Sequence, residues 1–526
     1  MKTLGKAKRL GALTLAGLLA MAGSGQAQEI RLTSSDGTVN MTGDFVAFED
    51  NSYVIATALG ELRVSAARVS CEGAACPALS QGDADFKISG SDEIATGMMP
   101  LLLEGYAGSK DAAAEIGNTG QNGQLVAKLI GDQGFGDDLA TVEVTGSSAT
   151  QGFQNLLSGD SEIVMATRRI QPEEARALSA DGAGNMVDPQ QEHIIAVDSL
   201  VVITHPDNPI PALDVRQLFG IYSGAVSNWS QVGGPDLPVQ VVIANISADR
   251  SDSFEGSFFG SADIQVTPNA EVVESSNQVP QFVNNNPGAI GVVSYAFQRG
   301  ANAVKVINQC GLVEEPDAFS AKTEEYSLQR RLFLYTRGDT LSAPGQDFVN
   351  YAASAEADGV IRKAGFIGFN VDRREQNIED PRSQVLLQPG IDNFETNLKR
   401  EMLSQMLEHD RLSTTFRFRT GSAQLDERGI VDRDRLVDYL SQQPAGTEVV
   451  LVGFTDEVGR FESNLDLSKR RSAEVTNQLL AFADNRLSNI RFSSAGFGEI
   501  APSGCNATEN GRRINRRVEV WIKSPA

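Results

Sequence analysis

The stretch GFTDEVGRFESNLDLSKRRSAEV, residues 453–475, decides how the last part of the chain folds. Its first residues end the apolar run TEVVLVG, which is typical of a buried strand, and its second half has the spacing of an amphipathic helix. The stretch therefore puts Thr455 and Asp456 in a turn and Arg470 and Arg471 on the helix that follows. A carboxylate and two guanidiniums are thus carried by one strand–turn–helix unit.

Residues 411–526 continue this alternation on both sides of the opening stretch. The segments STTFRFRTGSAQL, TEVVLVGFTD, IRFSSAGFGE and RRVEVWI predict four strands, with a helix between each pair. The charge of this part is nearly balanced, with 17 Lys and Arg against 15 Asp and Glu, although the whole chain has a net charge of −23. A separate C-terminal domain is expected here.

Motifs on several segments of this domain resemble the OmpA-like peptidoglycan-binding domain, which is an α+β sandwich. They are Phe418, Gly421, Ser422, Leu425, Gly453, Phe454, Thr455, Asp456, Gly459, Asn464, Leu467, Ser468, Arg471, Gly496, Phe497, Gly498, Glu499, Pro502, Gly511, Arg512, Asn515, Arg516, Arg517, Val518 and Glu519. The resemblance covers the whole of residues 411–526.

This resemblance implies a ligand and a site. Domains of the family hold the diaminopimelate residue of the peptidoglycan stem peptide, which ends in an ammonium and a carboxylate. The match implies Asp456 for the ammonium and Arg471 for the carboxylate, since a planar guanidinium makes two bonds to a carboxylate. Arg470 lies about 100° away around the helix and should face elsewhere. The further residues implied for this site are Thr455, Gly459 and Asn464, while Arg516 and Arg517 are expected to be structural.

Residues 84–371 show strands alternating with helices, which predicts α/β construction with parallel sheets. The apolar run HIIAVDSLVVITHP, residues 193–206, predicts a buried strand where the chain crosses between lobes. In order, SGSDEIATGMMPLLL, GSSATQGFQNLLSGDSEIVMATRRIQPEE, SDSFEGSFF and NPGAIGVVSYAF resemble the phosphate-type periplasmic substrate-binding proteins that serve ABC importers. The resemblance implies a two-lobed type II periplasmic-binding-protein fold with the ligand in the cleft.

An oxyanion in such a cleft needs helix N-terminal amides, hydroxyls and a guanidinium. The residues that match this need are Ser91, Ser147, Ser148, Thr167, Arg168, Ser251 and Ser253. The chain departs from the family pattern at Ser247, where an Arg is usual, and at Asp252, where a Gly is usual. Asp92 and Glu93 would repel a bound anion. The alternative is that Ser91 and Asp92 only cap a helix and that Arg168 only forms a surface ion pair.

The N-terminal residues predict export and a small β domain. Residues 1–27 combine four basic residues, an apolar run from Leu10 to Ala22 and a small-residue end, which is typical of a signal peptide cleaved near Ala27. Residues 28–80 alternate with the period of strands. Cys71 and Cys76 are expected to form a disulfide in an oxidising compartment. The sequence leaves open whether Cys310 and Cys505 form a second one.

Residues 372–410 predict a polar connector and then a helix, which together space the last two domains. The expected fold class is therefore α/β multidomain, with a small β domain, a two-lobed domain and an OmpA-like domain.

The charge of the exported chain argues against nucleic acid as a partner. Cleavage after Ala27 removes four positive charges and no negative ones, so the net charge falls from −23 to −27. No metal, cofactor or catalysis is expected, because His193, His205 and His409 lack ligand spacing and no nucleophile motif is present.

The expected function is a non-enzymatic periplasmic solute-binding protein for phosphate or a similar oxyanion, with an ABC importer as a candidate partner. It is tethered non-covalently to peptidoglycan, beside the cell wall and outer membrane. The alternative function is a structural envelope linker whose two-lobed domain docks protein partners and binds no solute.

Overall fold

The computed structural model describes residues 29–34, 39–49, 52–66, 69–73, 75–76, 84–118, 123–244, 266–273, 275–418 and 427–525. The expected signal peptide, residues 1–27, lies outside the described residues, as do Ser251 and Ser253. Within the described ranges, no helix has the length and apolar character that crossing a membrane requires.

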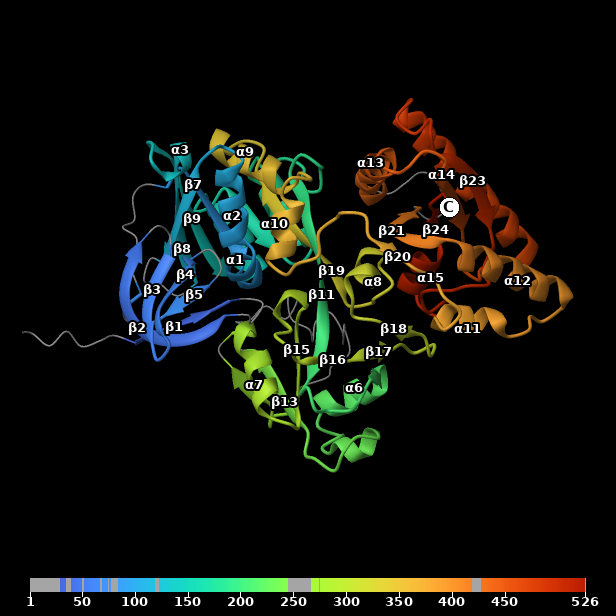
Figure 1. The fold of residues 1–526 in the computed structure, drawn as a ribbon, viewed down its shortest axis with the longest axis horizontal. Coiled ribbons are helices and arrows are strands. Elements are labelled where there is room, and N and C mark those ends of the chain that lie inside the picture. The colour runs from blue at the N-terminus through green and yellow to red at the C-terminus, as the bar shows by residue number, and fades with distance from the viewer. Residues whose placement is uncertain are drawn as a thin grey trace, which may run out of the picture.

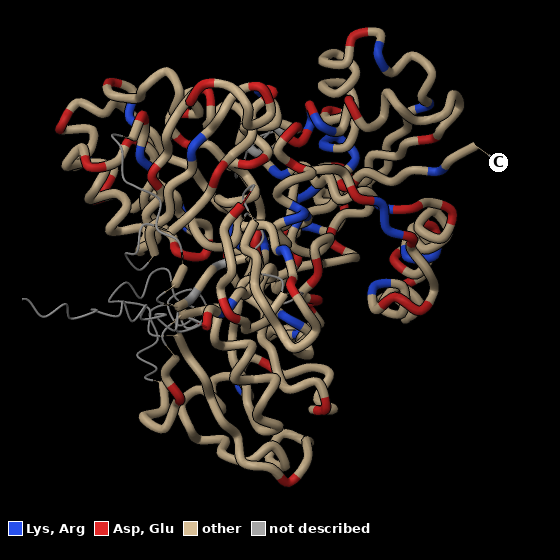
Figure 2. Tube along the Cα trace, turned by 60° about the vertical axis from the view of Figure 1, so that its left-hand side comes forward, with Lys and Arg blue, Asp and Glu red and all other residues tan. Residues whose placement is uncertain are grey.

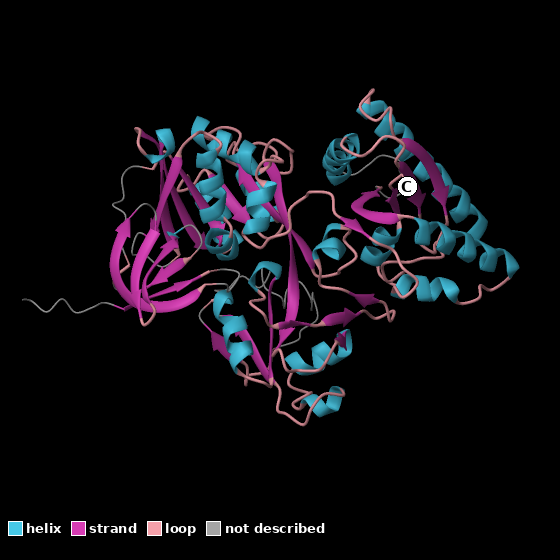
Figure 3. Ribbon diagram, in the orientation of Figure 1, coloured by secondary structure: helices cyan, strands magenta, loops and turns pink. Residues whose placement is uncertain are grey.

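The N-terminal domain is a five-stranded antiparallel sheet with the order β4-β3-β2-β1-β5 (Figure 3). Its strands are β1 (Glu29–Thr33), β2 (Asn40–Glu49), β3 (Ser52–Thr57), β4 (Gly60–Ser65) and β5 (Ser70–Glu72). Ile30, Leu32, Tyr53 and Ile55 form its buried core at alternating positions. The Cys71–Cys76 disulfide joins the end of β5 to the following turn, which confirms that prediction.

An eleven-stranded sheet runs through both lobes of the second domain (Figure 1). Lobe one holds β6 (Phe86–Ser91), β7 (Ala113–Asn118), β8 (Gln124–Ile130), β9 (Asp138–Ser147) and β10 (Ile163–Ala166). Lobe two holds β13 (Gln240–Ala244), β14 (Glu271–Val273), β15 (Ala289–Ser294) and β16 (Asn302–Ala303). The lobes share β11 (Glu192–Thr204) and β19 (Gln329–Thr336), so the predicted crossing strand is confirmed.

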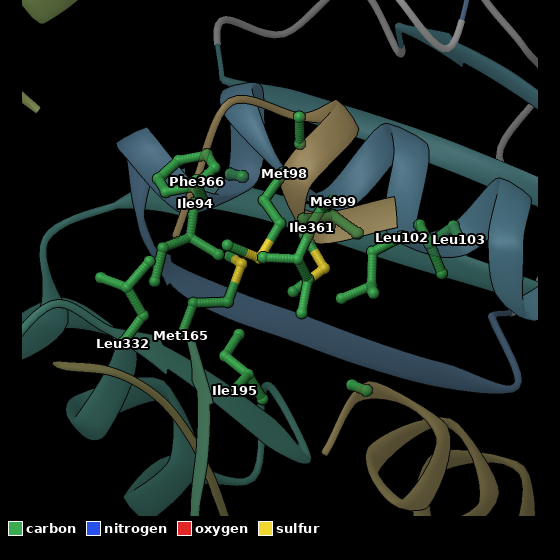
Figure 4. Packing of buried hydrophobic residues seen from close by; sticks show 14 of the residues in the cluster. Ile94, Met98, Met99, Leu102, Leu103, Met165, Ile195, Leu332, Ile361 and Phe366 are labelled. Atoms are coloured by element: carbon green, nitrogen blue, oxygen red, sulfur yellow. The ribbon is translucent and has the colours of Figure 1, made fainter. Parts of the chain in front are cut away.

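The helices of lobe one lie beside this sheet. They are α1 (Asp92–Gly97), α2 (Met99–Gly108), α3 (Gly131–Gly134), α4 (Ala149–Ser158), α5 (Pro172–Ala180), α9 (Ala343–Ala352) and α10 (Asp358–Lys363). All but the four-residue α3, which buries only Gly131, bury apolar residues in the cores of this sheet. Figure 4 shows Ile94 of α1, Met99 of α2 and Met98 between the two helices in one buried cluster with Met165 and Leu332 of the sheet. This packing fixes where α1 begins relative to the ends of the strands.

Lobe two has its own core and a second, three-stranded sheet. Its helices are α6 (Val215–Tyr222), α7 (Val279–Asn285) and α8 (Ala318–Lys322). The small sheet contains β12 (Ala212–Asp214), β17 (Lys305–Ile307) and β18 (Val313–Glu314).

The expectation of parallel sheets is only partly right. β6 is parallel to β9 and β10, and β13 is parallel to β14 and β15. However, β7, β8 and β9 follow one another as antiparallel strands. The crossing strands β11 and β19 are antiparallel to each other, β19 is antiparallel to β10, and β11 is antiparallel to β15. Strands linked by short turns must reverse direction, whereas those linked through a helix, such as β9 and β10, can stay parallel.

The C-terminal domain has the predicted alternation of strands and helices. Its sheet has the order β20-β21-β24-β22-β23, made of β20 (Arg373–Arg374), β21 (Asp410–Arg417), β22 (Glu448–Gly453), β23 (Arg491–Gly496) and β24 (Arg517–Lys523). Its helices are α11 (Pro381–Leu387), α12 (Asn393–Glu408), α13 (Glu427–Ser441), α14 (Phe461–Ala483) and α15 (Glu509–Asn515).

The expectation that residues 372–410 space two domains is wrong. A helix does form there, but α11 and α12 pack against the sheet of the C-terminal domain. The residues they bury in this second core are Leu386, Leu398, Met402, Leu403 and Met406, in contact with a cluster that includes Phe454 and Trp521. The segment is therefore part of the domain it was expected to hold at a distance, because its apolar residues complete that domain's core.

Candidate functional site

Asp456 and Arg471 lie close together where β22 leads into α14. The loop between them turns at Gly459, whose φ of +116° is strained for residues with a side chain. Arg471 is buried on the inner side of α14 and its neighbour Arg470 is exposed, as the helical register predicts. We call Thr455, Asp456, Asn464, Arg471 and Arg516 the loop–helix site.

The carboxylate of Asp456 already has a cationic partner. Arg516 Nη1 donates to Asp456 Oδ2 at 2.7 Å, and the backbone N–H of Val458 donates to Asp456 Oδ1 at 3.2 Å. The sequence reasoning gave Arg516 only a structural place beside the last strand. That interpretation missed its direct contact with Asp456, which the Asn515-Arg516-Arg517 motif could have indicated.

Arg471 is a buried cation. Its exposed fraction is 6%, and its Nη1 finds no hydrogen-bond partner among the described residues. The guanidinium lies over the ring of Phe418, 5.1 Å from the ring centroid. Burial foremost, and then the charge of Arg516, lower the pKa of Arg471, while Asp456 opposes them. Two guanidiniums and one carboxylate therefore face one another, and this arrangement suits an anionic ligand group at Arg471.

Asn464 holds the loop rather than standing free for a ligand. Its Nδ2 donates to the backbone oxygens of Asp456 at 3.2 Å and Val458 at 3.4 Å, and also to the carboxylate of Glu499. Thr455 donates its backbone N–H to Gly498 O at 2.9 Å. The Oγ1 of Thr455 is buried and has no partner within the described part of the chain.

The predicted cleft hydroxyls of lobe one gather at one edge of the sheet. In the parallel pairs, Ser91 of β6 stands opposite Ser147 of β9, and Gly90 stands opposite Met165 of β10. The carboxyl ends of these strands thus bring Ser91, Ser147 and Thr167 to the same edge. Gly90 is required there, since its φ is +128° and a Cβ would lie 2.1 Å from Met165 O.

Ser148 and Arg168 lie beside this edge, and both have partners. Ser148 caps α4 by accepting from Gln151 N at 3.1 Å. Arg168 makes a bidentate ion pair with Glu174, with both N···O distances at 2.8 Å, and donates to Thr150 Oγ1 at 2.8 Å. The alternative that Arg168 forms an ion pair is therefore correct, but the pair is largely buried rather than on the surface.

The structure reveals a second charged group at the crossing strands that the sequence reasoning missed. Arg330 of β19 donates through Nε to Asp198 Oδ2 at 2.9 Å, and its Nη2 contacts the carboxylate of Glu93. Asp198 of β11 is fully buried and accepts from Ser294 Oγ at 2.7 Å. The sequence feature that could have indicated this group is Asp198, a single aspartate within the apolar run of residues 193–206.

This group changes the expected role of Glu93. Burial raises the pKa of Glu93, Arg330 opposes that rise, and Asp198 adds to it. Because Arg330 neutralises Glu93, its carboxylate opposes an anion at this edge less than the sequence suggested. Among the described residues, no group of three or more His, Cys, Asp or Glu side chains could hold a metal ion.

Comparisons with known proteins match two parts of the chain. Residues 78–356, more than half of its length, match the PBP superfamily domain, and residues 417–516 match the OmpA family. The phosphate-binding protein PstS of Staphylococcus aureus (strain USA300) is 27% identical over 294 residues, which are 53% of this chain and 86% of that protein.

Two solved structures resemble the two parts separately. A putative phosphate ABC transporter substrate-binding protein with bound phosphate, from Clostridium perfringens, is 24% identical with a TM-score of 0.41, covering 54% of this chain and 98% of that one. The periplasmic domain of Helicobacter pylori MotB is 21% identical with a TM-score of 0.20, covering 23% of this chain and 76% of that one.

Proposed function

Because the chain belongs to the PBP superfamily and carries a C-terminal OmpA family domain, we propose that it is a non-enzymatic periplasmic protein that binds a small oxyanion and is tethered to peptidoglycan. The observation that carries the tether is Arg471, a buried guanidinium with an Nη1 that no described residue satisfies. The location proposed for the chain is the periplasm, beside the cell wall and outer membrane, after cleavage near Ala27.

The ligand of the loop–helix site is the free end of diaminopimelate in the peptidoglycan stem peptide. A buried cation without a hydrogen-bond partner is costly, and a carboxylate that accepts from Arg471 removes that cost. The ammonium of the same carbon goes to Asp456, whose two oxygens can accept from both Arg516 and a ligand amine. Asn464 and Gly459 act by shaping the loop.

The ligand of the cleft is phosphate or a similar tetrahedral oxyanion. This part is supported by the 27% identity to a phosphate-binding protein and by the hydroxyls that meet at the ends of β6, β9 and β10. The first turn of α4, a ten-residue helix that Ser148 caps, adds a helix N-terminus, where anions are favoured. Ser251 and Ser253 are proposed as further donors, and an ABC importer is the proposed partner.

A second candidate function is a structural envelope linker whose two-lobed domain docks proteins. The observation that favours it is the ion pair in which Glu174 neutralises Arg168, the cation expected to attract an oxyanion at this edge. A cleft without an unmatched cation attracts an oxyanion less strongly.

Three measurements on the full chain test these proposals. If the cleft binds an oxyanion, titration calorimetry with inorganic phosphate should show heat of binding. Thermal unfolding in the presence of phosphate should then show a raised melting temperature. Heat and melting shifts that are absent for phosphate, sulfate and phosphonate alike would favour the linker. Sedimentation with diaminopimelate-type peptidoglycan tests the tether, and a chain that stays in the supernatant would contradict it.

A further inference from the structure

A short acidic segment of lobe two, Thr323 to Glu325, is buried against the C-terminal domain. Glu324 is only 2% exposed. Its Oε2 is 2.9 Å from Arg417 Nε and 2.7 Å from Arg513 Nη1, and both arginines belong to the C-terminal domain. Arg417 Nη2 also donates to the backbone oxygen of Thr323. One carboxylate of the two-lobed domain thus holds two separate elements of its neighbour.

The backbone at Glu324 is unusual in a way that points to a function. Its φ is +59°, which a residue with a side chain seldom adopts. Such strain persists where the surrounding contacts over-determine the conformation. Here those contacts are the ion pairs across the domain junction, together with Arg331 Nη2, which donates to Glu324 Oε1 at 2.7 Å.

The two arginines held by Glu324 each adjoin one half of the loop–helix site. Arg417 directly precedes Phe418, whose ring lies under the guanidinium of Arg471. Arg513 lies on α15 three residues before Arg516, which holds Asp456. Arg417 Nη1 also donates to Ile514 O at 2.5 Å, so β21 and the end of α15 are tied together.

Independent contacts keep the segment in place. Glu325 makes a bidentate pair with Arg411, at 2.8 and 3.0 Å. The disulfide between Cys310 of lobe two and Cys505, which the sequence left open, joins the same two domains covalently. Figure 2 shows acidic and basic residues interleaved where the C-terminal domain meets the rest of the molecule. The two domains therefore meet at a fixed interface.

We propose that Glu324 is a positioning residue for the loop–helix site, so that the two-lobed domain itself prepares the C-terminal domain to bind the wall. Glu324 touches neither Asp456 nor Arg471. It fixes β21 and α15, and these set where Phe418 and Arg516 lie. The inference rests on the proposed peptidoglycan binding and adds that wall affinity depends on a residue of the other domain.

The test uses the full oxidised chain and a soluble muropeptide that carries diaminopimelate. Glu324→Gln should weaken muropeptide binding about tenfold, because the site loses its support while its own residues remain. The matched control is Asp317→Asn, which removes one interface carboxylate whose partner, Arg374, adjoins no part of the site. Affinity in the control should stay within about twofold of the wild type, because asparagine keeps the cap on α8 that Asp317 provides by accepting from Ser320 N.

A second readout separates positioning from a general loss of folding. The Nε–H resonance of Arg471, identified by its loss in Arg471→Lys, should shift in Glu324→Gln and stay in place in Asp317→Asn. Arg513→Gln removes the same ion pair from a more exposed side chain and should weaken binding in the same way. In the double variant, the losses of binding free energy from Glu324→Gln and Arg513→Gln should be less than additive, because both substitutions break the same ion pair.

The outcomes are distinguishable. If Glu324→Gln does not fold, as seen by circular dichroism, Arg513→Gln decides. Variants that fold and bind the muropeptide as tightly as the wild type would overturn this inference alone. A wild-type chain that does not bind the muropeptide would overturn the proposed tether, and this inference with it.

Discussion

Asp456 and Arg516 form a buried ion pair, with Arg516 Nη1 2.7 Å from Asp456 Oδ2. Arg471 lies beside this pair with no ion pair of its own to the described residues. Asp456 and Arg471, the two residues expected to hold the ligand charges, therefore affect folding differently. Asp456 pairs with the neighbouring charge of Arg516, whereas Arg471 is repelled by that charge.

This difference predicts opposite costs for two alanine variants. Asp456→Ala removes the carboxylate that pairs with Arg516 and favours the charge of Arg471, and it should lower the free energy of unfolding by about 3 to 5 kcal/mol. Arg471→Ala relieves the repulsion with Arg516 and should cost less than Asp456→Ala. Urea unfolding followed by tryptophan fluorescence checks the order, and a larger loss for Arg471→Ala would contradict the account.

A second prediction concerns the cleft. Arg168→Gln should weaken phosphate binding measured by calorimetry, because Arg168 contacts Thr150 in the first turn of α4, beside the proposed anion. Arg169→Gln is the matched control, since Arg169 is half exposed and pairs with Glu192 instead. Its affinity for phosphate should match that of the wild type. Equal losses in both variants would show that only the net charge of the lobe matters.

A third prediction follows from the packing of α11 and α12. A fragment of residues 411–526 lacks both helices and exposes Phe454 and Trp521, which they cover. Each large apolar side chain left uncovered costs about 1.5 to 3 kcal/mol. The fragment should therefore unfold without a cooperative transition, whereas residues 372–526 should unfold cooperatively. Calorimetric melting of the two fragments decides, and a sharp transition for 411–526 would contradict the structure.

A fourth prediction concerns acid. Burial raises the pKa of Glu325, but Arg411 and Arg517 outweigh burial and the charge of Glu519, and the pKa falls from 4.5 to about 2. A carboxylate whose pKa is lower in the folded state than in the unfolded state stabilises the protein at pH values above its unfolded-state pKa. This stabilisation is lost as the pH falls through the folded-state pKa. The contribution of Glu325 should thus be complete above pH 4.5 and fade toward pH 2.

The measurement is the urea midpoint at pH 5 and at pH 3. The difference between the two midpoints should be smaller in Glu325→Gln than in the wild type, because the variant has no group to protonate at this position. A difference of the same size in both chains would show that Glu325 does not contribute to the acid sensitivity.

Much of the fold could be predicted from local patterns, because each pattern reflects one element and its neighbours. The alternation around residues 453–475 gave the order of strands and helices in the C-terminal domain, and the run 193–206 gave the crossing strand β11. The short loop between Cys71 and Cys76 likewise made their disulfide predictable.

Contacts between distant segments could not be predicted in this way. Asp456 and Arg516 are 60 residues apart, and Cys310 and Cys505 are 195 apart, so only the folded chain brings them together. The apolar stripe of α12 predicted a helix but not what covers it. The register separated Arg471 from Arg470, but it could not show that the Arg471 guanidinium lies over the ring of Phe418, which follows β21.

The most direct test of the tether is sedimentation of the full chain with diaminopimelate-type peptidoglycan, comparing the wild type with Arg471→Ala and Arg470→Ala. Both variants lose one positive charge from neighbouring positions of α14. Arg471 is buried and belongs to the loop–helix site, whereas Arg470 is exposed and does not. The account predicts that the wild type and Arg470→Ala sediment with the wall while Arg471→Ala stays in solution, since losing the partner of a buried ligand charge costs about 2 to 5 kcal/mol. Retention of Arg471→Ala equal to that of Arg470→Ala would contradict it.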